Sequence, residues 1–208
     1  MSTTLLFVEL LIIGTQTSIW LFILILTAFG FQWISNIVSV STSAFDSIVT
    51  VIFLTLIYIL GILFDRFADY VFARWDKKIA NAVFTIKHSP PFLIRFRIAK
   101  ENEYLDRQFE YTRSRLRISR ASAINFLLIT ILSILLICTR LSHLANKYLY
   151  VIFIGGVGIA LTGWSLFAWK KLLTGFYELI KMAIQPNKVF HKKTKRFIKG
   201  KHGRLKVS

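Results

Sequence analysis

The chain has 208 residues, of which 55% are hydrophobic, and its formal net charge is +17. A single cysteine excludes an intrachain disulfide and a thiolate metal cluster. Four long apolar runs in so short a chain leave too few residues for a separate soluble enzyme domain, which excludes that class.

The apolar runs define the predicted fold. They cover residues 5–29, 47–64, 122–138 and 148–169. A helix needs about 17–25 residues to cross the apolar core of a bilayer, and each run has that length. The sequence therefore predicts an all-α membrane protein with four transmembrane helices in one domain, residues 1–186.

The basic residues are distributed unevenly. Of the 27 Lys and Arg residues, thirteen lie in the connection 65–121 and twelve lie from residue 170 onward. Short loops rich in Lys and Arg stay in the cytoplasm. We therefore expect both termini and the long second connection in the cytoplasm and two short loops outside. The expected location is a plasma membrane, namely the inner membrane of a bacterium.

Positive charge beside spans on one side indicates contact with anionic lipid rather than with nucleic acid. The tail, residues 187–208, is basic and predicted to be disordered. The expected contacts with anionic headgroups follow the fourth span and are Lys170, Lys171, Lys192, Lys193, Lys195 and Arg196.

The first run carries polar residues at membrane depth. Glu9, Gln16 and Thr27 share one face at about 100° per residue. Such a face belongs against protein or water, because lipid cannot satisfy its polar atoms. We favour packing on another helix, and the alternative is a water-filled path. Glu9 also lies near enough to the cytoplasmic end to reach the interface on its own.

The second and third runs continue as helical patterns into the second connection. No proline occurs between Thr50 and Lys87, and after Pro90 and Pro91 the pattern resumes at Glu101. The sequence therefore predicts that these two helices extend into a cytoplasmic helical hairpin, residues 65–121. The segment 91–99 mixes apolar and basic residues, and it either continues the hairpin or lies in the lipid headgroups.

Opposite charges line the two arms of this predicted hairpin. Asp65 and Asp69 are four residues apart, and Arg113, Arg117 and Arg120 form a stripe on the other arm. A hairpin folded near residue 93 places Asp65 level with Arg120, and Asp69 level with Arg117. We interpret the set as an interhelical charge cluster. The alternatives are a divalent-cation site, the charged vestibule of a pore, or acid–base catalysis, for which no cleft is visible.

Small residues mark one face of the fourth run. Gly156, Ala160 and Gly163 share that face, and small residues at this spacing allow two membrane helices to approach closely. We favour packing within the protomer over contact with a second copy.

These features predict a non-enzymatic, homo-oligomeric membrane module that presents its basic hairpin to a soluble cytoplasmic partner. The alternative is a pore, or an effector that permeabilises the membrane after oligomerisation. No pattern typical of a catalytic, cofactor-binding or metal-ligating site occurs in the sequence.

The charge distribution yields a test of topology. A reporter that is active only in the cytoplasm should be active when it is fused after Ser208 or inserted near Ser89. The same reporter should be inactive within residues 39–43. Activity in that predicted outer loop would contradict the four-span arrangement.

Overall fold

The computed structural model describes residues 3–32, 43–83, 103–141 and 146–184. These residues form four helices, each of which contains one apolar run and is long and apolar enough to cross a membrane. The all-helical fold predicted from the sequence is therefore confirmed. The helices are α1 (Thr3–Phe29), α3 (Ser43–Val83), α5 (Glu103–Thr139) and α6 (Lys147–Ile184).

Three helices are much longer than a membrane requires. α3, α5 and α6 have 41, 37 and 38 residues. At about 1.5 Å per residue each reaches roughly 55–60 Å, nearly twice the apolar thickness of a bilayer. Each therefore continues past its apolar run as one helix. The turn of the predicted hairpin, the segment 91–99 and the basic tail lie outside the described residues.

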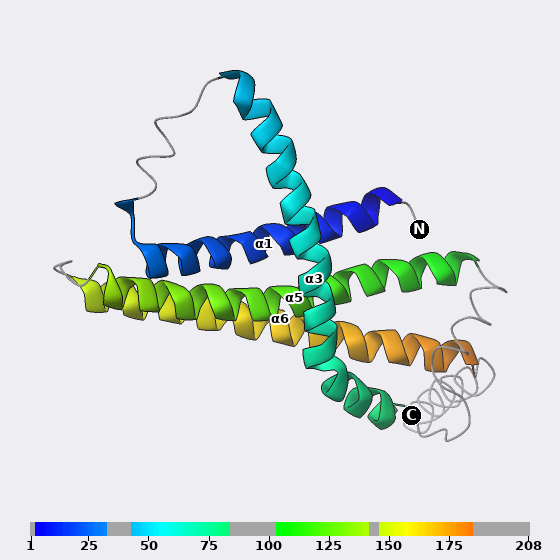
Figure 1. Ribbon diagram of the computed structural model, residues 1–208. Coiled ribbons are helices and arrows are strands. Elements are labelled where there is room, and N and C mark those ends of the chain that lie inside the picture. The colour runs from blue at the N-terminus through cyan, green and yellow to red at the C-terminus, as the bar shows by residue number, and fades with distance from the viewer. Residues whose placement is uncertain (1–2, 33–42, 84–102, 142–145, 185–208) are drawn as a thin grey trace, which may run out of the picture.

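The helices form a layer with one helix crossing it. Figure 1 shows α1, α5 and α6 side by side, with α3 passing steeply across them. α5 packs most extensively on α6, while α1 packs on both α3 and α5. The hairpin expected from the sequence would have run α3 along α5. Instead the two helices meet over a short stretch, because α5 pairs along its length with α6.

The crossing of α1 and α3 depends on two glycines. A Cβ atom on Gly14 would overlap the carbonyl oxygen of Ile57, and one on Gly61 would overlap that of Leu10. The two backbones can approach this closely only because neither glycine has a side chain. Around the crossing, the rings of Phe7 and Tyr58 lie 5.3 Å apart.

The first half of α3 projects beyond this crossing. Its side chains are exposed from Ser47 to Leu56, although most of them are apolar. Figure 1 shows this part of the helix extending away from the other three. An apolar surface of this size must be covered by lipid or by another polypeptide.

At the ends of the apolar runs that lie next to the basic segments, aromatic side chains join α3, α5 and α6. The rings of Phe72 and Trp169 pack edge to face with centroids 4.6 Å apart. Further along, Phe109 and Phe176 pack in the same way at 5.7 Å. The core therefore continues into the predicted cytoplasmic extensions, and it holds the neighbouring charged side chains in place.

The C-terminal end of α1 is capped. Gly30 ends the helix with a φ of 78°, in the left-handed region that glycine adopts without strain. Arg140, just after α5, donates from Nε to the carbonyl of Thr27 at 3.0 Å and from Nη2 to that of Ala28 at 2.6 Å. A cation at the last carbonyls of a helix also complements its dipole.

The glycine crossing gives a test of the fold. Gly14→Ala and Gly61→Ala should each lower the free energy of unfolding by about 1–3 kcal/mol, because the added methyl group pushes two backbones apart. Thermal unfolding in mild detergent measures the effect. Gly175→Ala is the matched control, since a Cβ there meets nothing within 4 Å. Equal behaviour of the three variants would contradict the crossing.

Candidate functional site

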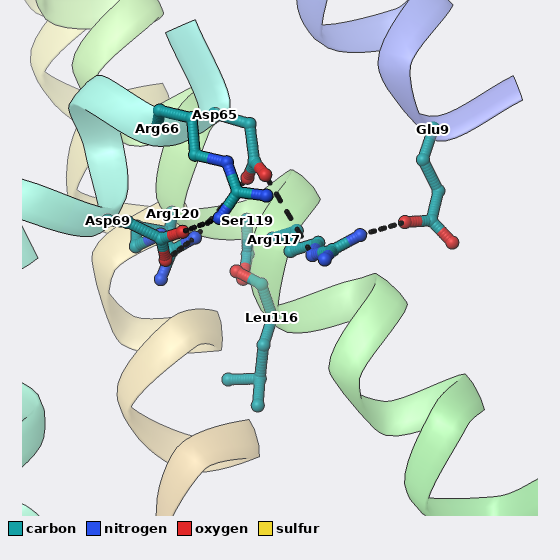
Figure 2. A network of polar contacts seen from close by, with 8 residues as sticks. All are labelled: Glu9, Asp65, Arg66, Asp69, Leu116, Arg117, Ser119 and Arg120. Atoms are coloured by element: carbon teal, nitrogen blue, oxygen red, sulfur yellow. Dashed lines mark hydrogen bonds and ion pairs between the residues drawn. The ribbon is translucent and has the colours of Figure 1, made fainter. Parts of the chain in front are cut away.

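Five charged residues from three helices meet at one end of the apolar runs. Figure 2 shows Glu9 of α1, Asp65 and Asp69 of α3, and Arg117 and Arg120 of α5 gathered at one level. The apolar run of α3 ends just before Asp65, and the apolar run of α5 begins just after Arg120. The cluster therefore forms where the apolar parts of two helices give way to their polar parts.

Asp65 lies at the centre of the cluster. Its side chain is only 5% exposed, and each carboxylate oxygen faces a different arginine. Arg120 Nη2 lies 3.3 Å from Asp65 Oδ1, and Arg117 Nε lies 3.9 Å from Asp65 Oδ2. A buried carboxylate is tolerated only when it is paired in this way. The two arginines therefore hold the middle of α3 against α5.

Arg117 extends the cluster to the first helix. Its Nη1 lies 3.9 Å from Oε2 of Glu9, whose side chain is 2% exposed. Neither carboxylate oxygen of Glu9 has a hydrogen-bond partner among the described residues. The ion pair with Arg117 therefore compensates this buried charge, and Glu9 does not reach the interface on its own.

The register of the pairs differs in part from the one expected from the sequence. Asp65 meets Arg120, as the hairpin register predicts. Asp69 does not pair with Arg117: it forms its ion pairs with Arg120 and, on its own helix, with Arg66. The crossing of α3 over α5 explains the difference, because helices that cross bring one short stretch of each into contact rather than a long row.

A second polar network lies further along the apolar runs, about two helical turns from Glu9 on α1. Oε1 of Gln16 accepts hydrogen bonds from Ser122 Oγ at 3.0 Å and Asn125 Nδ2 at 3.3 Å. Oδ1 of Asn125 accepts from Trp20 Nε1 at 3.0 Å and from Thr17 Oγ1 at 3.4 Å. The polar face of the first helix thus meets α5.

Sequence reasoning identified Gln16 but not its partners. Asn125 is completely buried, and it is the amide on which this network centres. An asparagine inside an apolar run is itself a signal of an interhelical hydrogen bond. Thr27, which was expected on the same face, donates instead to the carbonyl of Ile23 in its own helix at 2.7 Å.

The remaining predicted residues lie apart from these networks. Arg113 is exposed on α5, two turns beyond Arg120, and Lys170 and Lys171 are exposed on α6. The small-residue face of α6 lies on open surface rather than inside the protomer, where Gly158 packs on α5 against Thr130 instead. The exposed small residues are Gly156, Ala160 and Gly163. Lys192, Lys193, Lys195 and Arg196 lie outside the described residues.

The geometry favours a structural role for the charge cluster. Both oxygens of Asp65 face guanidinium groups, so this carboxylate is engaged by arginine rather than presented to a cation. Within the described ranges, no three His, Cys, Asp or Glu side chains are grouped so that they could hold a metal ion. The cluster fixes α1, α3 and α5 relative to one another.

Comparison with known proteins returned no match to a family model, to a curated protein or to a solved structure. The role of the chain is therefore inferred from its own residues.

The ion pairs predict different costs for two similar substitutions. Asp65→Asn should lower the free energy of unfolding by about 3–5 kcal/mol, because Arg117 and Arg120 each lose the buried carboxylate that they share. Asp69→Asn should cost less than about 1 kcal/mol, since the side chain of Asp69 is 44% exposed. Thermal unfolding in detergent compares the two isosteric variants. A larger loss for Asp69→Asn would show that Asp65 is not the centre of the cluster.

Proposed function

We propose that the protein is a non-enzymatic integral membrane module, homo-oligomeric, that presents the basic cytoplasmic ends of its helices to a soluble partner. The proposal includes insertion by four spans into a bacterial plasma membrane, with both termini in the cytoplasm. The hydrogen bonds of Gln16 to α5 are the observation that favours this module over a pore. Each further element of the proposal has its own support.

The polar face of α1 is satisfied inside the protomer. The amide oxygen of Gln16 accepts hydrogen bonds from Ser122 and Asn125, and Asn125 in turn binds Trp20. A face that lines a water-filled path would leave its polar atoms to water. Because α5 already supplies hydrogen-bond partners to this face, its polar atoms do not need water. This supports a packed module rather than a pore.

The arrangement of the charged residues supports the same choice. A pore vestibule would offer its carboxylates to passing cations. Asp65 is buried, and its two oxygens face Arg117 and Arg120.

Contacts at both ends of α1 support the proposed orientation. Glu9 near its beginning lies beside Arg117, in the strongly basic part of the chain. At the other end, Arg140 binds the last carbonyls of the same helix. The beginning of α1 and the basic extension of α5 therefore lie on the same side, and the positive-inside rule makes that side the cytoplasm.

Exposed faces support self-association. The small-residue face of α6 has room for close approach, since a Cβ on Gly156 or Gly163 would meet nothing within 4 Å. The outer half of α3 exposes a second apolar surface between Ser47 and Leu56. Small residues on an open helix face allow another membrane helix to pack against it.

The extensions support a cytoplasmic partner. α5 begins at Glu103, almost 20 residues before its apolar run, so it projects roughly 27 Å from the membrane boundary. Exposed arginines on this extension include Arg113 and Arg115. A rigid, basic projection of this kind suits an acidic protein surface.

Two variants in one reconstitution experiment test the proposal. Gln16→Leu should lower the melting temperature, because it removes interhelical hydrogen bonds worth roughly 0.6–2 kcal/mol, and should leave the oligomer mass unchanged. Gly163→Leu should reduce the oligomer mass and leave the melting temperature of the protomer nearly unchanged. Mass in mild detergent and ion flux in liposomes are measured for both.

Each variant serves as the control for the other. The wild-type protein should be oligomeric and should conduct no ions. Ion flux that Gln16→Leu abolishes at unchanged stability would establish the pore instead. A wild-type protein that is monomeric in several mild detergents would contradict the homo-oligomer.

A further inference from the structure

A pocket opens between α3, α5 and α6, beside the charge cluster. Its volume is about 470 Å³, within the range of sites that hold small ligands. It is lined by two kinds of side chain that occupy different helices. The charged lining residues lie on α3 and α5 and are Arg66, Asp69, Asp76, Arg113, Arg117 and Arg120. The apolar and aromatic ones lie mostly on α6 and are Leu116, Trp169, Leu173, Phe176, Tyr177 and Ile180.

The charged wall has more guanidinium groups than carboxylates. Four arginines and two aspartates line the pocket, and Asp65, which pairs with two of the arginines, lies behind the wall in the protein. Arg117 and Arg120 are therefore partly neutralised. Arg66 in turn faces Asp69. Arg66 and Arg113 are the most exposed of the four arginines, so they are the ones that a ligand can reach most easily.

One buried donor on this wall is unsatisfied. Arg120 is only 7% exposed, and its Nε has no hydrogen-bond acceptor among the described residues. A buried donor without an acceptor costs roughly 1–3 kcal/mol, more for a charged group. This Nε is closed to solvent, so a ligand would meet the exposed guanidinium groups of the wall instead. Guanidinium groups suit phosphate in particular, because their planar fork matches two of its oxygens.

The apolar wall sets a second requirement. Leu116, Leu173 and Ile180 offer hydrocarbon surface, and the rings of Trp169 and Phe176 extend it. A free phosphate ion would leave this wall uncovered. A ligand that carries both a phosphate and hydrocarbon would cover both walls.

The position of the pocket suggests the source of such a ligand. Arg120 and Trp169 stand at the cytoplasmic ends of two apolar runs, and the pocket continues from that level to Ile180. In a bilayer this is the layer of lipid headgroups, where tryptophan and tyrosine are enriched.

We propose that this pocket binds one phospholipid molecule of the cytoplasmic leaflet, with the phosphate against the arginines and the glycerol and first methylene groups against α6. The inference depends on the membrane placement in the proposed function. It goes further, because it assigns a specific lipid to one site rather than general contact with anionic headgroups.

Native mass spectrometry of the delipidated full-length protein in detergent tests this site. The probes are dioleoyl phosphatidylglycerol, an uncharged galactosyl diacylglycerol with the same acyl chains, and sn-glycerol 3-phosphate. The wild-type protein should bind one phosphatidylglycerol per chain and neither of the other two probes. The double variant Arg66→Gln/Arg113→Gln should bind that lipid about tenfold more weakly.

The matched control is Arg74→Gln/Arg115→Gln. It removes the same charge from the same two helices at exposed positions that do not line the pocket. Its affinity for phosphatidylglycerol should equal that of the wild type. Equal weakening by both double variants, or by neither, would overturn the proposal. So would equal binding of the galactolipid, which needs no phosphate site, or tight binding of glycerol phosphate, which needs no acyl chain.

A melting curve accompanies each variant. If the pocket double variant is destabilised, Arg66→Gln alone replaces it, because the side chain of Arg66 is 75% exposed and its loss leaves the fold intact. That variant must also bind the lipid more weakly than Arg74→Gln. Carbonate extraction of the wild type from membranes reports separately on the proposed function. A chain that is not extracted yet binds no lipid would overturn the pocket alone.

Discussion

Charge removed from water has to be matched by opposite charge, and in this chain the matching joins three helices at a single level. Asp65 faces Arg117 and Arg120, and Arg117 also faces Glu9. Removing one charge of such a set costs far more stability than replacing the whole set by apolar residues. The remaining charge cannot return to water without separating the helices. The crossing of α3, the position of α1 and the wall of the adjacent pocket all depend on this cluster.

The amide network beside the cluster has a different physical role. Hydrogen bonds between neutral side chains add modest stability in a membrane, but they are directional and specify which faces meet. Asn125 binds both Gln16 and Trp20, which lie one turn apart on α1. This fixes the rotation of α1 about its own axis, whereas the ion pairs fix its height. The two networks together leave α1 a single position against α5.

Composition and length were sufficient to predict the helices, because an apolar run of span length has few structural alternatives. The facing of Asp65 and Arg120 also followed from the sequence, since helical spacing puts both near the membrane boundary. The steep crossing of α3 did not. It depends on Gly14 meeting Ile57, a contact between distant segments that no local pattern indicates. The pairing of Glu9 with Arg117 was missed for the same reason, as 108 residues of sequence separate the two.

Most helix pairs hold their crossing angle by interlocking ridges and grooves of side chains. Where Gly14 and Gly61 bring two backbones together, no side chains interlock. One helix can therefore rotate against the other about this point of contact. The outer part of α3 is a lever arm of about 27 Å from Ser43 to Gly61, while Asp65 lies only about 6 Å beyond the fulcrum. A sideways force on the outer arm therefore acts with mechanical advantage on the ion pairs around Asp65.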